Sequence, residues 1–152
     1  MINFFLLTRW LHTLSFAVWF GGLVFLSFVL YGSLQKFPLG SNHSRLFLGR
    51  VTHRFAWLGL VALTVGALSG LMMGAEALNT VALDLARFKY GLVSILFILA
   101  AWLVLTARQV CHFAYHDTDH GDEINRLYKR LRWLIRFAIL FSLPLPYLIL
   151  IK

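Results

Sequence analysis

The fold of this chain is decided by its first long apolar run, FFLLTRWLHTLSFAVWFGGLVFLSFVLYGS, residues 4–33. At a rise of about 1.5 Å per residue, a helix of this length exceeds the roughly 30 Å of hydrocarbon in a bilayer. The run is also too long and too rich in Trp and Phe for a removable signal peptide. We therefore expect a membrane-spanning helix of the mature protein, and it contains one group foreign to lipid, the imidazole of His12.

Three further apolar runs follow, at about 55–75, 90–107 and 133–151. The chain of 152 residues is 60% hydrophobic and 13% charged, with a mean hydropathy of +0.77, against an apolar share of about 45–50% in soluble domains. These features predict an all-α, integral membrane four-helix bundle with up-down topology. We expect a single domain, 1–152, with helices at about 4–33, 53–75, 87–116 and 124–151.

The net charge of +8 is distributed unevenly along this topology. The first and third connections, with the adjoining helix ends, carry ten basic residues: Lys36, Arg45, Arg50, Arg54, Arg108, Arg126, Lys129, Arg130, Arg132 and Arg136. The opposite side carries four: Arg9, Arg87, Lys89 and Lys152. The positive-inside rule then predicts cytoplasmic basic loops and both termini outside, in a multi-pass protein of the inner (plasma) membrane. The expected partner is the lipid bilayer with its anionic lipids, not nucleic acid; a homo-oligomer or a larger membrane complex is left open.

Small residues recur along the second helix at intervals of four: Ala62, Gly66, Gly70 and Gly74. Such a ridge lets a neighbouring backbone approach closely, and we interpret it as a packing surface rather than as room for a flat porphyrin. Within 124–136, the spacing of Ile124, Leu127, Leu131 and Leu134 predicts an amphipathic start to the last helix. Pro144 and Pro146 predict a kink or an irregular turn inside its apolar part.

His12 lies about 12 Å along the first helix from residue 4, and it shares a helical face with Trp19. An ionisable side chain within a membrane span marks a functional site by default. Lys89 opens the third helix on the same side of the membrane and is a neighbour of His12 if those two helices pack together. Met72 and Met73 end the second helix on that side.

This constellation is compatible with two kinds of ligand. Neutral imidazole binds copper as well as haem iron, and the Lys89 amine would serve as a second ligand or neutralise a propionate. For haem b, aromatic side chains such as Trp19 would supply a dry, flat-walled slot. For copper, Met72 and Met73 would supply soft thioether ligands.

A second histidine set lies at the basic side of the topology. His112 and His116 are spaced i, i+4 on one helix face, and His53 heads the preceding helix. Two imidazoles at this spacing with a third from another helix are typical of zinc or copper sites. We expect His43 and His120 to be solvated interface residues.

Three segments carry a family resemblance: RWLHTLSFAVWFGGLVFLSFVL (9–30), RFAWLGLVALTVGALSGLMMG (54–74) and LARFKYGLVSILFILAAW (85–102). They resemble the membrane domain of the copper-resistance protein D family over about two thirds of the chain. The resemblance implies a four-helix membrane domain that handles copper, with His12 and Lys89 at the family's histidine and lysine positions.

The same layout is similar, second, to the four-helix membrane protoporphyrinogen oxidases of haem synthesis, which are thought to use such a His and Lys pair around a tetrapyrrole. This chain departs from that family's motifs at LSFVLYG (26–32) and at FSLPLPYL (141–148). We therefore expect copper binding or transport first, then a redox membrane protein that binds haem b or a porphyrin, as in the protoporphyrinogen oxidases, then an accessory subunit of a respiratory complex; if the protein is an enzyme, we expect a haem-dependent oxidoreductase. We identify no catalytic residue in the sequence, which favours a protein that is not an enzyme.

Overall fold

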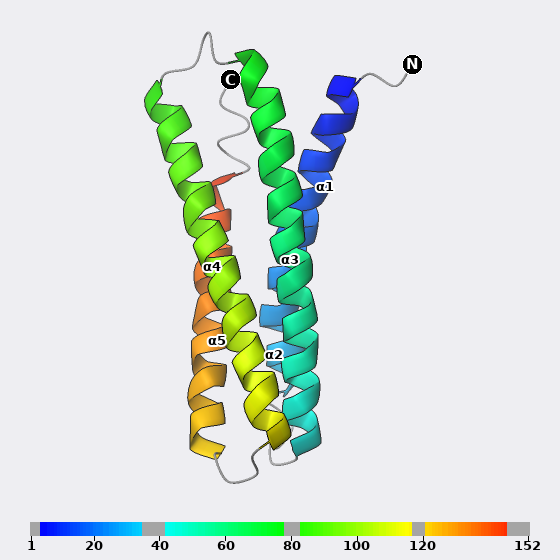
Figure 1. Ribbon diagram of the computed structural model, residues 1–152, viewed down its shortest axis with the longest axis vertical. Helices are drawn as coiled ribbons and strands as arrows, with labels where there is room; N and C mark the ends of the chain where they lie inside the picture. Colours follow the sequence, from blue (N-terminus) through cyan, green and yellow to red (C-terminus); the bar gives the residue numbers. More distant parts are fainter. Residues whose placement is uncertain (1–3, 35–41, 78–82, 117–120, 146–152) are drawn as a thin grey trace.

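In the computed structural model, the described residues are 4–34, 42–77, 83–116 and 121–145, and they are helical almost throughout, with no strand among them. The elements are α1 (Phe4–Val24), the π-helix η1 (Phe25–Leu30), α2 (Tyr31–Leu34), α3 (Asn42–Ala77), α4 (Leu83–His116) and α5 (Gly121–Ser142). Because α1, η1 and α2 follow one another without a break, the chain forms four helical rods (Figure 1). The predicted all-α fold with four helices is confirmed.

The rods extend beyond the apolar runs from which they were predicted. α3 begins at Asn42 rather than at 53, and α4 begins at Leu83 rather than at 87. The reason is that hydropathy marks the part of a helix suited to lipid, whereas backbone hydrogen bonding continues into polar sequence. α5 begins at Gly121 rather than at 124 and ends at Ser142, followed by a turn at Leu143, just before Pro144. Residues 146–152 of the predicted fourth helix lie outside the described residues.

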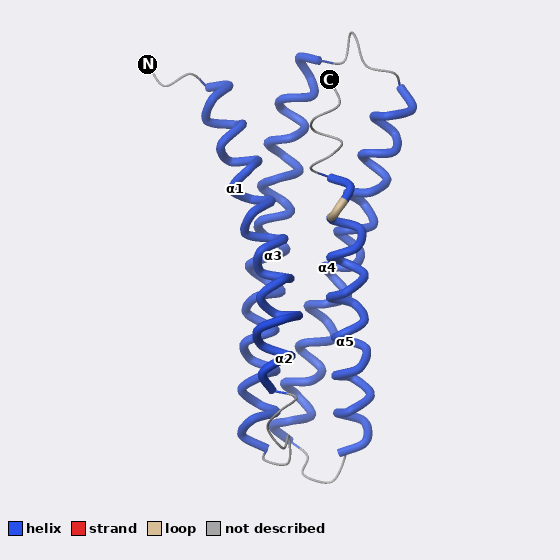
Figure 2. Tube along the Cα trace, turned by 180° about the vertical axis from the view of Figure 1, so that it is seen from behind, coloured by secondary structure: helices blue, strands red, loops and turns tan. Residues whose placement is uncertain are grey.

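Neighbouring rods pack in sequence order. α1 packs along α3, α3 along α4 and α4 along α5, while α5 returns to α1 and η1 (Figures 1 and 2). We call the end at which α1 and α4 begin and α3 ends the upper end, as in Figure 1. The lower end is where α3 and α5 begin and α4 ends. This arrangement confirms the up-down order of the four rods.

Apolar side chains lie both inside and outside this bundle. The interior is closed by fully buried side chains from every rod, including Leu26, Leu48, Leu103 and Leu131. Large apolar side chains also point outward: Trp10, Phe28, Leu58, Ile98 and Trp102 are each at least half exposed. Three helices are long and apolar enough to cross a membrane, over Leu6–Leu30, Leu46–Met72 and Arg87–Phe113.

α5 differs from the other rods in the way the sequence predicts. Ile124, Leu127, Leu131 and Leu134 are all buried against the bundle, whereas Arg126, Lys129 and Arg130 are exposed. The predicted amphipathic start of the last helix is therefore confirmed. No membrane span is found within the described part of α5, so a fourth span, as predicted, would depend on residues outside the description.

Candidate metal site at His12

The imidazole of His12, a residue of α1, packs against the backbone of α3. Its Nδ1 atom is 2.8 Å from the carbonyl oxygen of Gly66 and 3.4 Å from Ser69 Oγ. The ring is half-buried. The imidazole therefore faces the neighbouring rod, and its hydrogen-bond partner is the backbone of α3.

Two glycines of the small-residue ridge make this approach possible. A Cβ atom added at Gly70 would lie 3.1 Å from His12 Cε1, and one added at Gly66 would lie 3.3 Å from Ser15 Cβ. Both distances are shorter than ordinary packing contacts, so α1 rests directly on the bare backbone of α3. The packing interpretation is confirmed for these two positions. The surroundings of Gly74 lie outside the described residues.

The hydrogen bond to Gly66 fixes which imidazole nitrogen carries the proton. A carbonyl oxygen only accepts, so Nδ1 is the protonated nitrogen and donates. In the neutral ring the lone pair is then on Nε2. Within the described part of the chain, Nε2 has no hydrogen-bond partner. Metal-binding histidines typically donate their second N–H to a backbone carbonyl or carboxylate in this manner.

Ser69 is the second group of α3 in contact with the imidazole nitrogen. Its hydroxyl is within donating distance of the carbonyl oxygens of Val65, at 2.8 Å, and Gly66, at 3.0 Å. The hydroxyl proton is therefore directed to the backbone of α3, and the oxygen lone pairs remain for the Nδ1 proton of His12. Ser69 is buried. Ser69 was not predicted as a site residue; the signal in the sequence was a polar residue three positions after Gly66 and next to Gly70.

Lys89 does not join His12 in the bundle. Lys89 lies in the second turn of α4, and Figures 1 and 2 both show that part of α4 on the other side of α3 from α1. The condition for the predicted pair, that the first and third rods pack together, is not met at the upper end, because α3 lies between them. Met72 of α3 is 52% exposed, and the side chain of Met73 lies outside the described residues.

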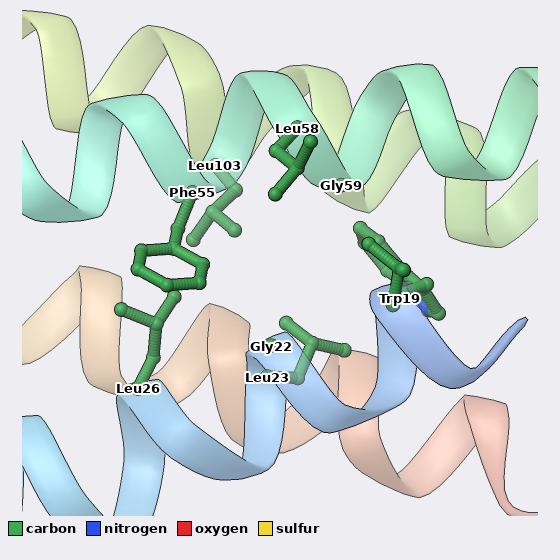
Figure 3. Close-up of a pocket in the computed structure, with 9 residues that line it drawn as sticks. Trp19, Gly22, Leu23, Leu26, Phe55, Leu58, Gly59 and Leu103 are labelled. Atoms are coloured by element: carbon green, nitrogen blue, oxygen red, sulfur yellow. The ribbon is translucent and has the colours of Figure 1, made fainter. Parts of the chain in front are cut away.

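Trp19, which was predicted to line a cofactor slot, is buried between α1, α3 and α5. Its Nε1–H donates to Ser142 Oγ at 2.9 Å, and the Ser142 hydroxyl donates to the Ala138 carbonyl at 2.7 Å. The indole lies on Gly59, where an added Cβ would fall 2.9 Å from two ring carbons. This bridge from α1 to α5 leaves only a small apolar cavity of about 10 Å³ beside the ring (Figure 3). That volume is about the size of one water molecule, so the described residues show no slot for a flat ring beside Trp19.

A second buried polar contact joins α2 to α3 nearer the lower end. Tyr31 Oη is 3.5 Å from Thr52 Oγ1, and both side chains are buried. The guanidinium carbon of Arg132, on α5, lies 6.0 Å from the centroid of the Tyr31 ring. Burial raises the pKa of the Tyr31 phenol well above its ordinary value. We assign this contact to packing between the rods.

The predicted histidine set at the basic side is not assembled in the part of the chain that the structure describes. His53 is half-buried on α3, while His112 on α4 is exposed with its ring edge against Phe113. No group of three potential metal ligands occurs among the described residues. The side chain of His116 lies outside them.

No family model matches the chain, and no curated protein or solved structure matches it. The resemblance to the copper-resistance protein D family therefore stays a prediction from the sequence motifs. The function is accordingly inferred from the geometry of His12.

Proposed function

We propose that this chain is a multi-pass membrane protein that binds copper through Nε2 of His12 and handles it near the upper end of the bundle. The single observation that carries the proposal is the 2.8 Å hydrogen bond from Nδ1 to the Gly66 carbonyl. This bond holds the ring in one orientation and one tautomer, and it leaves the basic nitrogen available to a metal ion.

The surroundings of His12 favour an ion over a larger ligand. The ring is in close contact with Gly70, and His12 lines neither the cavity beside Trp19 nor the groove between α3 and α4 at the lower end. Met72 follows Gly70 by two residues and so lies on the opposite side of α3; its exposed thioether is a soft ligand of the kind that selects copper(I), and it would reach the metal only from another copy of the chain. Met73 and Lys89 remain candidate ligands, with Lys89 reaching the site only from another copy of the chain or after movement of α4.

Haem b is the second candidate, and one observation favours it. Among the described residues His12 is an isolated imidazole, with no cluster of ligands around it. Haem iron already has four porphyrin nitrogens and needs only an axial ligand from the protein. Bound haem would bring redox chemistry to the site, and His12 would hold the iron through Nε2.

The proposed setting is the inner membrane with the lower end in the cytoplasm. Three span-capable helices support insertion, and the excess of Lys and Arg toward the lower end supports this orientation. His12 then lies in the outer half of the bilayer, where it would receive copper from the outer side or deliver it there.

The proposal is tested by metal analysis and absorbance spectroscopy of the purified protein. Wild type incubated with copper(I) is expected to retain stoichiometric copper and to be colourless, and His12→Ala is expected to lose the copper. His112→Ala is the matched control, since it removes an exposed imidazole from the lower end and should retain the metal. A Soret band that disappears in His12→Ala selects haem instead. Retention of neither ligand by wild type, or equal loss from both variants, overturns the proposal.

A further inference from the structure

A groove at the lower end of the bundle, between α3 and α4, has no part in the proposed copper site. It is lined by Leu46, Arg50, Arg108, Cys111, His112 and Tyr115 and has a volume of about 310 Å³. We call it the arginine groove. This volume is at the lower end of the range found for small-molecule sites in proteins.

The groove brings together side chains that recognise one type of chemical group. Arg50 comes from α3 and Arg108 from α4, so two guanidinium groups face one space from opposite walls. Both arginines are exposed, and no ion pair joins either to a carboxylate within the described ranges. Guanidinium groups bind phosphate oxygens with paired, charge-assisted hydrogen bonds.

α3 and α4 pack tightly beside the arginine groove. A Cβ atom added at Gly49 would lie 3.2 Å from both Cys111 Sγ and Val110 Cγ1. α3 and α4 are therefore in direct contact at Gly49, next to the groove residues Arg50 and Cys111.

The level of the groove matches the headgroup region of a bilayer. Leu46 begins the apolar span of α3, and the span of α4 ends at Phe113, between the groove residues His112 and Tyr115. Leu46 gives the groove an apolar wall next to its charged residues. Basic pockets between membrane helices at this level are suited to the headgroups of anionic lipids.

From these observations we propose that the arginine groove binds a phosphate group, presented by an anionic phospholipid. The groove fits a phosphodiester headgroup between Arg50 and Arg108, with the glycerol and the first acyl carbons along Leu46. Free inorganic phosphate has the same chemistry, and the experiment below separates the two sources. The proposal is independent of whether His12 binds a metal.

Cys111 supplies a direct readout, because it lines the groove and is the chain's single cysteine. The protein is placed in nanodiscs of phosphatidylcholine alone or of phosphatidylcholine with phosphatidylglycerol, and Cys111 is labelled with N-ethylmaleimide, a neutral reagent. A third sample contains phosphatidylcholine nanodiscs with millimolar inorganic phosphate. The measured quantity is the ratio of labelling rates with and without the phosphate compound.

Phosphatidylglycerol is expected to slow the labelling of wild type about tenfold, the effect of one or two charge-assisted hydrogen bonds. The double variant R50Q/R108Q is expected to lose this protection. R126Q/R130Q is the matched control, since it removes the same charge from exposed positions of α5 near the lower end, and it should keep the protection. Protection by inorganic phosphate alone assigns the groove to the soluble ion, whereas protection by the lipid alone assigns it to the headgroup.

Three results would overturn the proposal. They are labelling that neither phosphate compound slows, protection that persists in R50Q/R108Q, and equal loss of protection in the two double variants. The last result would attribute the effect to diffuse surface charge rather than to the groove.

Discussion

At the scale of single residues, His12 shows how a helix made for lipid accommodates an imidazole. The ring gives its one proton to a carbonyl oxygen that already accepts from its own helix, which is possible because a carbonyl has two lone pairs. No polar side chain has to be brought into the membrane as the main partner. The polarity that remains is confined to Nε2, the atom with a lone pair for a ligand.

Gly70→Ala tests whether the position of the His12 ring against α3 determines the affinity for copper. The new Cβ would lie 3.1 Å from His12 Cε1, so the ring must turn or shift, and copper affinity is expected to fall by about 10- to 100-fold. Titration of copper(I) against a competing chelator gives the affinity. Gly21→Ala is the control, because nothing lies within 4 Å of its added Cβ. Wild-type affinity in Gly70→Ala would show that the ring position is not decisive.

Ser142→Ala tests the buried hydrogen bond across the bundle. The substitution leaves the Trp19 indole N–H without its acceptor at a site where the indole is 2% exposed. We expect a loss of about 1 kcal/mol in the free energy of unfolding, the magnitude of such bonds in membrane proteins. Unfolding titrations in mixed micelles measure it. In a cycle with Trp19→Phe, the two losses should be less than additive; strict additivity would show that the bond contributes nothing.

At the scale of elements, the close contact between α1 and α3 depends on glycines of α3, which have no side chain and let side chains of α1 reach the backbone. Gly59, Gly66 and Gly70 receive Trp19, Ser15 and His12 respectively, so three positions on one rod match three on the other. These contacts fix the rotation of α1 about its axis, and with it the direction of the imidazole.

Gly59→Ala is expected to destabilise the bundle by about 1–3 kcal/mol through overpacking. The Trp19 ring would be 2.9 Å from the new Cβ and is held at its other side by Ser142, so it has little freedom to withdraw. Gly91→Ala on α4 is the control, since its Cβ meets no atom within 4 Å. The same micelle titrations compare the two variants. Equal stability of both would contradict the close contact between Gly59 and Trp19.

The elements were largely readable from the sequence, and the site only in part. Apolar runs and helical spacing predicted four helices, the buried face of α5 and the break before Pro144, because these depend on local composition. The early start of α3 was missed because Asn42 to Arg45 are polar. The partner of His12 was missed because it is a backbone carbonyl, which every residue has and no motif marks. Lys89 was paired with His12 on the assumption that their helices are neighbours, a matter of rod order that spacing along the chain does not determine.

At the scale of the whole molecule, charge and apolar surface are separated along the bundle axis. The lower end contains the exposed Arg50, Arg54, Arg108, Arg126 and Arg130, whereas the upper end contains fewer basic residues. The outer surface between them is apolar over three rods. For the proposed membrane protein, this distribution predicts an orientation with the lower end in the cytoplasm.

Cysteine labelling in cells tests that orientation. In a Cys111→Ala background, Glu123→Cys places a thiol at the start of α5, and Asn79→Cys places one in the connection between α3 and α4. A membrane-impermeant maleimide is expected to label Asn79→Cys in intact cells and Glu123→Cys only after the membrane is opened. The reverse pattern would place the basic end outside and His12 in the inner half of the membrane.

The bridge between Trp19 and Ser142 also bears on how the molecule is synthesised. The two residues are 123 positions apart, and at ribosomal speeds of about 5–20 residues per second the second is made roughly 6–25 s after the first. During that interval the nascent first helix is already available for insertion, while its indole N–H has no acceptor from the last. The contact between α1 and the end of α5 is therefore completed only after Ser142 has been made, and a chain truncated before Ser142 would lack the acceptor of the Trp19 indole.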